Sequence, residues 1–233
     1  MNRKRGAILL LTVIAVTFQF ADATAQIGIR GGVNLSKFVG ADVEGAEDLM
    51  GLNAGLSLNL ITIGPLSLVP EVYYAERGTR FSDQLRTLQN PNPDQPLTPQ
   101  DLELEFNLAY VEVPILAKLN LPFLSTRVVK PYIAGGPVFG FRLDCSITFT
   151  DGNTEQTVQD CADDNFSDPE TTFKESDRGA VFVGGIDFEF PMIGTVTLDG
   201  RYYKGLSRLQ EGGENSDVFN QSITLMLGYQ FAF

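Results

Sequence analysis

Apolar and polar residues alternate one by one through several stretches of this 233-residue chain, and this period of two constrains the fold more than any other feature. The C-terminal stretch shows the pattern most clearly. Large apolar side chains occupy every second position there, namely Ile223, Leu225, Leu227, Tyr229, Phe231 and Phe233. Because successive side chains of a β-strand point to opposite faces, this stretch predicts a strand with one apolar face.

The same alternation recurs earlier in the chain. The stretches are 26–38, 50–61, 66–81, 102–121, 132–144, 179–190 and 195–206, and the last one is 218–233. None has the periodicity of an amphipathic helix. Within 102–121 the apolar phase slips by one residue, which is what a β-bulge near Ala109–Val111 would produce. We therefore predict an all-β fold of eight strands.

The connections between these stretches alternate in length. The short ones are 62–65, 121–131 and 191–194, and the long, polar ones are taken as 40–49, 82–103, 145–178 and 209–217. If neighbouring strands are antiparallel, every short turn lies at one end of the sheet and every long loop at the other. Bacterial outer-membrane barrels have this layout, with short periplasmic turns and long extracellular loops. The sequence predicts an eight-stranded antiparallel up-and-down transmembrane β-barrel.

The charged residues of the strands decide between a membrane barrel and a soluble one. A soluble barrel would carry a dense layer of charges on its outer face. Here the strand charges are sparse, of both signs and accompanied by small polar residues, so they can pair inside a narrow lumen while the apolar face contacts lipid. Side chains fill a lumen of eight strands, so a wide pore is not expected. The predicted interior charge network is Arg30, Glu71, Arg77, Glu112, Lys118, Arg142, Asp187, Glu189, Asp199 and Arg201.

The first 25 residues differ from the rest. A basic start is followed by an uncharged apolar run and by small residues at Ala23–Ala25, a pattern that predicts a secretory signal peptide over 1–25 and a barrel domain over 26–233. A membrane anchor is the alternative, but the apolar run is shorter than the roughly 20 residues of a spanning helix. Without this segment, 14 basic and 28 acidic residues give a net charge of −14, which argues against nucleic acid as a partner.

Catalytic and metal chemistry is poorly represented. The chain has no histidine, which excludes Ser-His-Asp and Cys-His mechanisms and histidine metal sites. Asp187 and Glu189 share a strand face and could form an acid/base pair, but we favour ion pairs with Arg201 or Arg30. We expect no catalytic residue, metal or cofactor.

The acidic residues gather in the long loops, which hold 20 of the 29. Asp163, Asp164 and Asp168 could bind a cation there, although they lack the spacing of an EF-hand. A solvated acidic loop is the favoured interpretation.

Several motifs resemble the PorT-type outer-membrane β-barrel proteins of the Bacteroidetes, within the broader OmpA/OmpX-like group. They are "AYVEVPILAKLN" (109–120), "PYIAGGPVFGF" (131–141), "GGIDFEF" (184–190), "LDGRYYKGLSRL" (198–209) and the aromatic C-terminus. The resemblance implies an outer-membrane location and contact with outer-membrane lipid. It also implies insertion by the barrel-assembly machinery, which would recognise Tyr229, Phe231 and Phe233. Trp is absent, so an aromatic girdle would consist of Tyr and Phe.

Four functions are compatible with these observations. The leading one is a non-enzymatic membrane anchor whose acidic loops serve interaction or envelope integrity. The PorT resemblance implies a second, a component of a protein secretion system with envelope proteins as partners. A narrow channel or small-ligand carrier is the third, and a barrel enzyme acting on lipid or peptide is disfavoured by the missing histidine. The sequence does not name a partner.

Cys145 and Cys161 are the two cysteines of the chain, and in an exported protein they are expected to form a disulfide. Two unrelated thiols are the alternative. The bridge would stabilise the fold by on the order of 3 kcal/mol, because it restricts the conformational freedom of the unfolded chain. Digestion without reductant should yield the two cysteine peptides joined, and reduction should separate them with a gain of two hydrogens. Alkylation of both cysteines before reduction would contradict the pairing.

Overall fold

The computed structural model describes residues 26–41, 43, 45–82, 102–151, 154–159, 173–209 and 217–231. The predicted signal peptide, Cys161, Phe233 and the acidic residues Asp163, Asp164 and Asp168 lie outside these ranges. Within them, no helix is long and apolar enough to cross a membrane. The predicted leader and the predicted disulfide therefore stay predictions.

Strands make up almost all of the described chain. They are β1 (Gln26–Val39), β2 (Ala46–Asn59), β3 (Ile61–Ile63), β4 (Leu66–Phe81), β5 (Leu102–Asn120), β6 (Val129–Asp151), β7 (Thr154–Gln159), β8 (Ser176–Phe190), β9 (Gly194–Gly205) and β10 (Phe219–Phe231). One short 3-10 helix, η1 (Pro122–Leu124), lies between β5 and β6.

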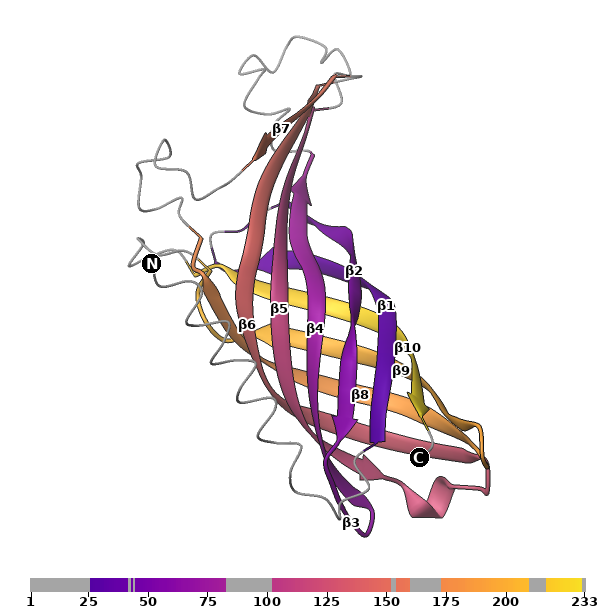
Figure 1. The fold of residues 1–233 in the computed structure, drawn as a ribbon. Helices are drawn as coiled ribbons and strands as arrows, with labels where there is room; N and C mark the ends of the chain where they lie inside the picture. Colours follow the sequence, from indigo (N-terminus) through magenta and orange to yellow (C-terminus); the bar gives the residue numbers. More distant parts are fainter. Residues whose placement is uncertain are drawn as a thin grey trace, which may run out of the picture.

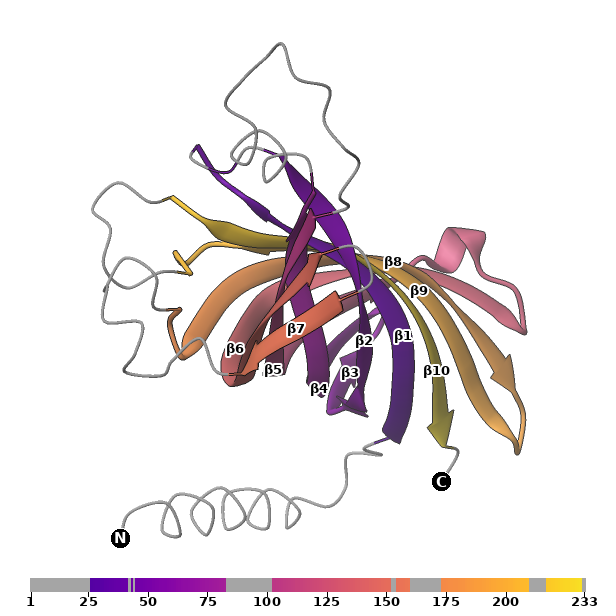
Figure 2. The same cartoon turned by 90° about the horizontal axis from the view of Figure 1, so that it is seen from above.

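Eight of these strands form a closed antiparallel barrel, as predicted. The strand order runs β2-β1-β10-β9-β8-β6-β5-β4, and pairing of β2 with β4 completes the ring. The first and last strands also pair, from Gly28 opposite Gln230 to Val39 opposite Phe219. Figures 1 and 2 show the strands tilted around a common axis. Closure matters because it gives each barrel strand a hydrogen-bonding neighbour on both sides. The hydrocarbon of the bilayer has no groups that could hydrogen-bond to an unpaired strand edge.

The two ends of the barrel differ as the connection lengths predicted. The turns after β3, β5 and β8 are short, and β1 begins and β10 ends at this same end. In outer-membrane barrels the short turns face the periplasm, so we call this the periplasmic end. The opposite, extracellular end carries the long connections and the part of β4, β5 and β6 that extends past the other strands (Figure 1).

The segment 145–178 is not wholly a loop, contrary to the prediction. β6 continues to Asp151, and β7 pairs with it antiparallel from Ser146 opposite Gln159 to Asp151 opposite Thr154. The reason is local: "SITFT" and "TEQTVQ" are rich in β-branched residues and flank Asp-Gly-Asn, a sequence that favours a hairpin turn. The first long loop is also shorter than predicted, because β2 begins at Ala46.

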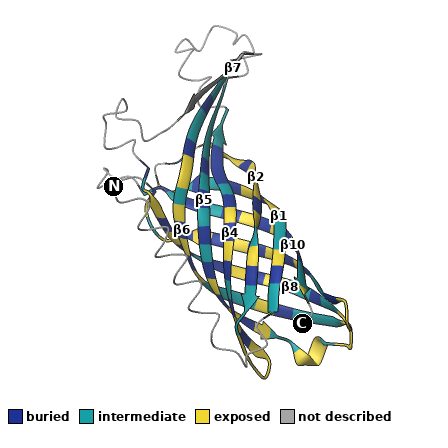
Figure 3. Cartoon of the chain, viewed as in Figure 1, coloured by how far each residue is buried: buried dark blue, intermediate teal, exposed yellow. Residues whose placement is uncertain are grey.

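The outer wall of the barrel is apolar and its inner wall polar. Leu56 and Leu225 are 54% and 58% exposed, whereas Glu71 and Asp199 are each 1% exposed. Figure 3 shows buried and exposed positions alternating along the strands. The expected inversion, with apolar side chains outward and strand charges inward, therefore holds at these positions. It fits a wall surrounded by lipid.

The interior of the extracellular end is an exception to this inversion. A register shift lies at Ala109–Tyr110, as predicted, but the extra residue is Leu143 of β6. The inward phase of β5 is therefore unbroken, and Phe106 and Leu108 point into the barrel. They pack there in an apolar cluster that also contains Phe38, Tyr110, Cys145, Ile147, Phe173, Leu209, Val43 and Val218.

Leu225→Arg tests whether the exposed wall contacts lipid. A cation near the middle of the bilayer should lower the free energy of unfolding by about 2–4 kcal/mol, whereas Gln221→Arg, nearer the extracellular end of β10, should cost about 0–1 kcal/mol. Urea unfolding in phospholipid vesicles, followed by circular dichroism, measures both. A cost below about 0.5 kcal/mol for Leu225→Arg is typical of a water-exposed site and would contradict a lipid-facing wall.

Candidate functional site

The charged side chains of the lumen form layers between the two ends of the barrel. The central layer is a quartet of Arg30, Glu71, Asp199 and Arg201. Arg201 contacts Glu71 (Nη1–Oε2 2.6 Å) and Asp199 (Nε–Oδ1 2.8 Å). Arg30 contacts Asp199 (Nη1–Oδ2 2.5 Å) and lies 3.6 Å from Glu71 (Nε–Oε1). Two cations and two anions thus neutralise one another in a site almost closed to solvent.

A second ionic layer lies toward the extracellular end. Arg77 donates two hydrogen bonds to Glu112, from Nε to Oε1 at 2.5 Å and from Nη2 to Oε2 at 2.9 Å. Its guanidinium also lies 3.8 Å from the centre of the Tyr203 ring. Arg77 donates a further bond to the hydroxyl of Ser222. This two-pronged pair orients both side chains, which a single contact would not.

Asp177 is a buried carboxylate of the same region that the sequence analysis missed. It is 2% exposed and accepts hydrogen bonds from Tyr203 Oη (2.9 Å), Asn220 Nδ2 (3.0 Å) and Ser207 Oγ (2.7 Å). The predicted long loop 145–178 includes Asp177. The alternation of "SDRGAVF" continues through Asp177, and this signal could have assigned it to the inner face of β8.

The third layer lies toward the periplasmic end. Lys118 and Asp187 form an ion pair, and Thr197 Oγ1 donates to Asp187 Oδ1 at 2.8 Å. The ammonium of Lys118 lies 4.0 Å from the centre of the Tyr132 ring. Tyr132 in turn donates from Oη to Asp199 Oδ2 at 2.9 Å, so it joins this layer to the central quartet.

The expected partners of Asp187 and Glu189 were wrong. We expected Arg201 or Arg30, but Asp187 pairs with Lys118, and Glu189 pairs with Lys130 at the barrel mouth. The shear of the barrel places residues of one strand at different heights from those expected by sequence order. Glu189 is also half-exposed and so lies at the edge of the lumen.

Arg142 differs from the other members of the predicted network. It is half-buried and lies opposite Tyr110 in the register of β5 and β6. Among the described residues, no ion pair includes it. The shift at Leu143 falls next to it, and a bulge of this kind re-aims neighbouring side chains.

A polar cavity of about 610 Å³ opens at the periplasmic end, below the Lys118–Asp187 pair. Its charged lining residues are Lys118, Arg127, Lys130, Asp187 and Glu189. Neutral polar side chains complete much of the wall, including those of Gln26, Asn59, Thr62, Ser67, Asn120, Thr195 and Gln230. Polar groups therefore form most of the wall of this cavity.

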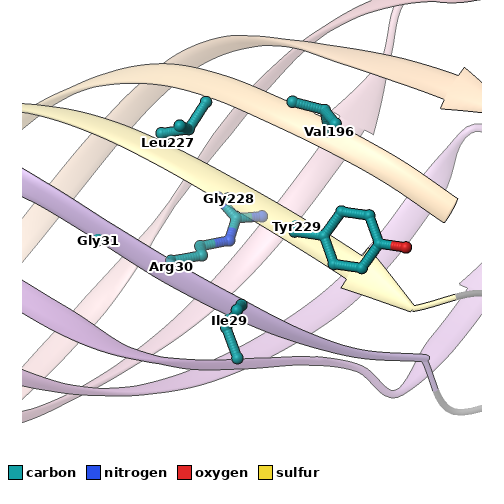
Figure 4. A pocket seen from close by; sticks show the side chains of 7 residues that line it. All are labelled: Ile29, Arg30, Gly31, Val196, Leu227, Gly228 and Tyr229. Carbon is teal, nitrogen blue, oxygen red and sulfur yellow. The ribbon is translucent and has the colours of Figure 1, made fainter.

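A second cavity, of about 450 Å³, lies between β1, β9 and β10, where glycines leave part of the wall without side chains. Figure 4 shows the residues that line it, namely Ile29, Arg30, Gly31, Val196, Leu227, Gly228 and Tyr229. Ile29 and Leu227 are exposed on the outer wall. The apolar part of this groove faces the same surroundings as the rest of the wall.

Two residues of the predicted insertion signal lie at the periplasmic rim. The rings of Tyr229 and Phe231 meet edge to face at 5.0 Å, and the Tyr229 hydroxyl donates to the carbonyl of Ile193 in the β8–β9 turn. Aromatic side chains at this level are typical of the girdles of membrane barrels. Recognition by the assembly machinery stays a prediction.

The carboxylates of the three layers are all engaged. Each one accepts a hydrogen bond or forms an ion pair with a cationic or hydroxyl partner. Among the described residues, no group of three or more Cys, Asp or Glu side chains could hold a metal ion. The three layers form a buried polar core.

A closed eight-stranded barrel with an apolar outer wall and a neutralised ionic interior defines a small outer-membrane β-barrel protein. The family model described as "Outer membrane protein beta-barrel domain" matches residues 19–211, and the chain belongs to that family. No curated protein matches the sequence significantly.

Solved structures similar to this chain include proteins of Yersinia and Neisseria. Ail of Yersinia pestis, crystallised with the heparin analogue sucrose octasulfate, is 14% identical with a TM-score of 0.41, over 89% of this chain and 99% of that one. Neisserial surface protein A is 12% identical with a TM-score of 0.41 over the same shares. The translocator domain of NalP from Neisseria meningitidis is 7% identical with a TM-score of 0.36, over 99% of this chain and 96% of that one.

Arg201→Met tests the central quartet. It leaves Glu71 and Asp199 buried with Arg30 as their shared cation, and we expect the free energy of unfolding in vesicles to fall by about 3–5 kcal/mol. Adding Glu71→Gln should recover part of that loss, because one uncompensated charge is removed. Arg80→Gln, which breaks a half-exposed pair with Glu103 and Glu105, should cost at most about 1 kcal/mol. Equal costs for the Arg201 and Arg80 variants would refute the special role of the quartet.

Proposed function

We propose that this protein is a non-enzymatic outer-membrane scaffold whose barrel anchors a surface for interaction at the extracellular end. The length of the strands carries the proposal. β5 and β6 have 19 and 23 residues, whereas β9 and β10 have 12 and 13. A tilted strand needs only about 9–11 residues to cross the hydrocarbon. About half of β6 is therefore available outside the lipid.

The side chains of this projecting sheet support its exposure to water. Arg80 of β4 bridges Glu103 (Nε–Oε1 2.6 Å) and Glu105 (Nε–Oε1 3.1 Å) of β5, and the three side chains are between 24% and 37% exposed. Ion pairs of this kind are unsuited to an acyl-chain environment, where charges are costly. The strand ends joined by the acid-rich connections of the sequence lie at this same end. A partner with basic groups would complement them, and divalent cations bridging the loops to neighbouring lipid would serve envelope integrity.

A PorT-like role in protein secretion is the second candidate. It rests on the motifs in 109–120, 131–141, 184–190 and 198–209. Such a role would use the periplasmic turns, where Phe123 of η1 is 79% exposed and Met192 of the β8–β9 turn is 96% exposed. A narrow channel has less support, since paired side chains occupy the middle of the lumen.

Site-specific photo-crosslinking in intact cells separates the first two candidates. A crosslinking amino acid replaces Thr150, near the tip of the projecting sheet, or Phe123 at the periplasmic end as the matched control. The scaffold proposal expects discrete adducts from position 150 and none from position 123. Adducts from position 123 alone, together with lost export of other proteins after deletion of the gene, would favour the secretion role and refute the scaffold.

A further inference from the structure

We propose that the cavity at the periplasmic mouth of the barrel is a binding site for a small hydrophilic anion, a molecule with a carboxylate or phosphate group and additional hydrogen-bond donors. This site lies at the opposite end from the surface discussed above and does not depend on it. Four features of the cavity support the proposal: its access, its charge, its free hydrogen-bonding groups and its size.

Access to the cavity is from the periplasmic side. Lys118 and Asp187 form its inner wall, and Tyr132 and the central quartet fill the lumen beyond them. The rim is formed by residues of the β3–β4, β5–β6 and β8–β9 connections, such as Gly64, Arg127 and Met192. Figure 1 shows β3 and η1 together at this end of the barrel. A ligand from the periplasm would therefore enter a pocket with a closed inner end.

The charge of the cavity favours an anion. Three cations, Lys118, Arg127 and Lys130, line it together with two carboxylates, Asp187 and Glu189. Each carboxylate already has a lysine partner, Lys118 for Asp187 and Lys130 for Glu189. Among the described residues, Arg127 is in no ion pair. One positive charge thus remains without a counter-charge at the mouth, on the side chain best suited to binding a carboxylate or phosphate with two parallel hydrogen bonds.

The neutral groups of the wall indicate further contacts. Asn59 Oδ1 accepts from Thr62 Oγ1 at 3.2 Å, and the hydroxyls of Thr62 and Ser67 lie 3.0 Å apart, so these groups largely satisfy one another. Asn120 is different, because its Oδ1 atom is buried without a hydrogen-bond partner. A buried acceptor left unpaired costs free energy, which a donor on a ligand would recover. An anion that also carries N–H or O–H groups meets both requirements.

The size of the cavity sets the scale of the ligand. Its volume of about 610 Å³ lies within the range of small-molecule sites, roughly 300–1,000 Å³. Its wall is mostly polar, which argues against a lipid chain or an aromatic compound. A short peptide with a free C-terminus and a glycerol phosphate both have the required chemistry, a terminal anion followed by hydrogen-bond donors.

Calorimetric titration of the protein, purified from outer membranes and reconstituted in phospholipid nanodiscs at low ionic strength, tests the site. The probes are tri-alanine, glycerol 3-phosphate and tri-alanine amide, which lacks the terminal charge. We expect saturable binding of at least one anion and at least tenfold weaker binding of the amide than of tri-alanine when tri-alanine binds. If only one anion binds, the result shows whether the site prefers a carboxylate or a phosphate ligand. If both bind, the site recognises negative charge in general.

Two variants connect the binding to the cavity. Arg127→Gln should weaken binding of the anion at least fivefold, whereas Lys204→Gln, which removes an exposed cation near the extracellular end of β9, should leave it unchanged. Both replaced side chains are exposed, and heat-modifiable gel migration verifies that each variant is folded. The proposal is overturned if neither anion binds saturably, if tri-alanine binds but its amide binds equally well, or if the Arg127→Gln variant binds the anion like the unchanged protein.

Discussion

Pairing of the first strand with the last is the interaction on which the rest of this structure depends. Without the β1–β10 ladder, two strand edges would face hydrocarbon with their N–H and C=O groups unpaired, at a cost of several kcal/mol for each group. Once the ring is closed, every barrel strand has an outer face toward lipid and an inner face toward the lumen. Leu56 and Leu225 lie on the outer face, where apolar side chains are favourable. The charged side chains of the inner face are stable there because they neutralise one another in ion pairs and in the central quartet.

The ladder could be predicted because its signal is local. Alternation places Leu225 and Thr224 on opposite faces whatever the rest of the chain does, and the lengths of the connections indicate which ends of the strands lie together. The closed barrel, its antiparallel order and most inward charges follow from these two patterns. The short strand β7 escaped prediction because its acidic surroundings resembled a solvated loop, although Asp-Gly-Asn between β-branched runs was present in the sequence.

Ion-pair partners could not be predicted, because they depend on the shear of the barrel. Asp187 and Arg201 lie on neighbouring strands, but the register places Asp187 opposite Thr197 and Arg201 opposite Val183. Asp187 thus meets Lys118 of β5, which lies two strands away around the barrel with β6 between them. The same argument applies to β5, where the extra residue at Leu143 of the partner strand keeps Leu108 pointing inward. An apolar phase slip in one strand does not reveal which of the two strands contains the additional residue.

The order of the apolar cluster, the ionic layers and the cavity along the barrel axis affects the strength of the ion pairs. The apolar cluster around Phe38, Leu108 and Phe173 lies on the extracellular side of the ionic layers, and the polar cavity lies on their periplasmic side. Apolar packing at the extracellular end keeps water away from Arg77 and Glu112, which strengthens their attraction by lowering the local dielectric. The Lys118–Asp187 pair marks the other boundary, between this buried section and the cavity. In the two proposals, the cavity takes a hydrophilic ligand from the periplasmic side and the projecting sheet offers a surface at the extracellular side, so one barrel would support two separate kinds of contact.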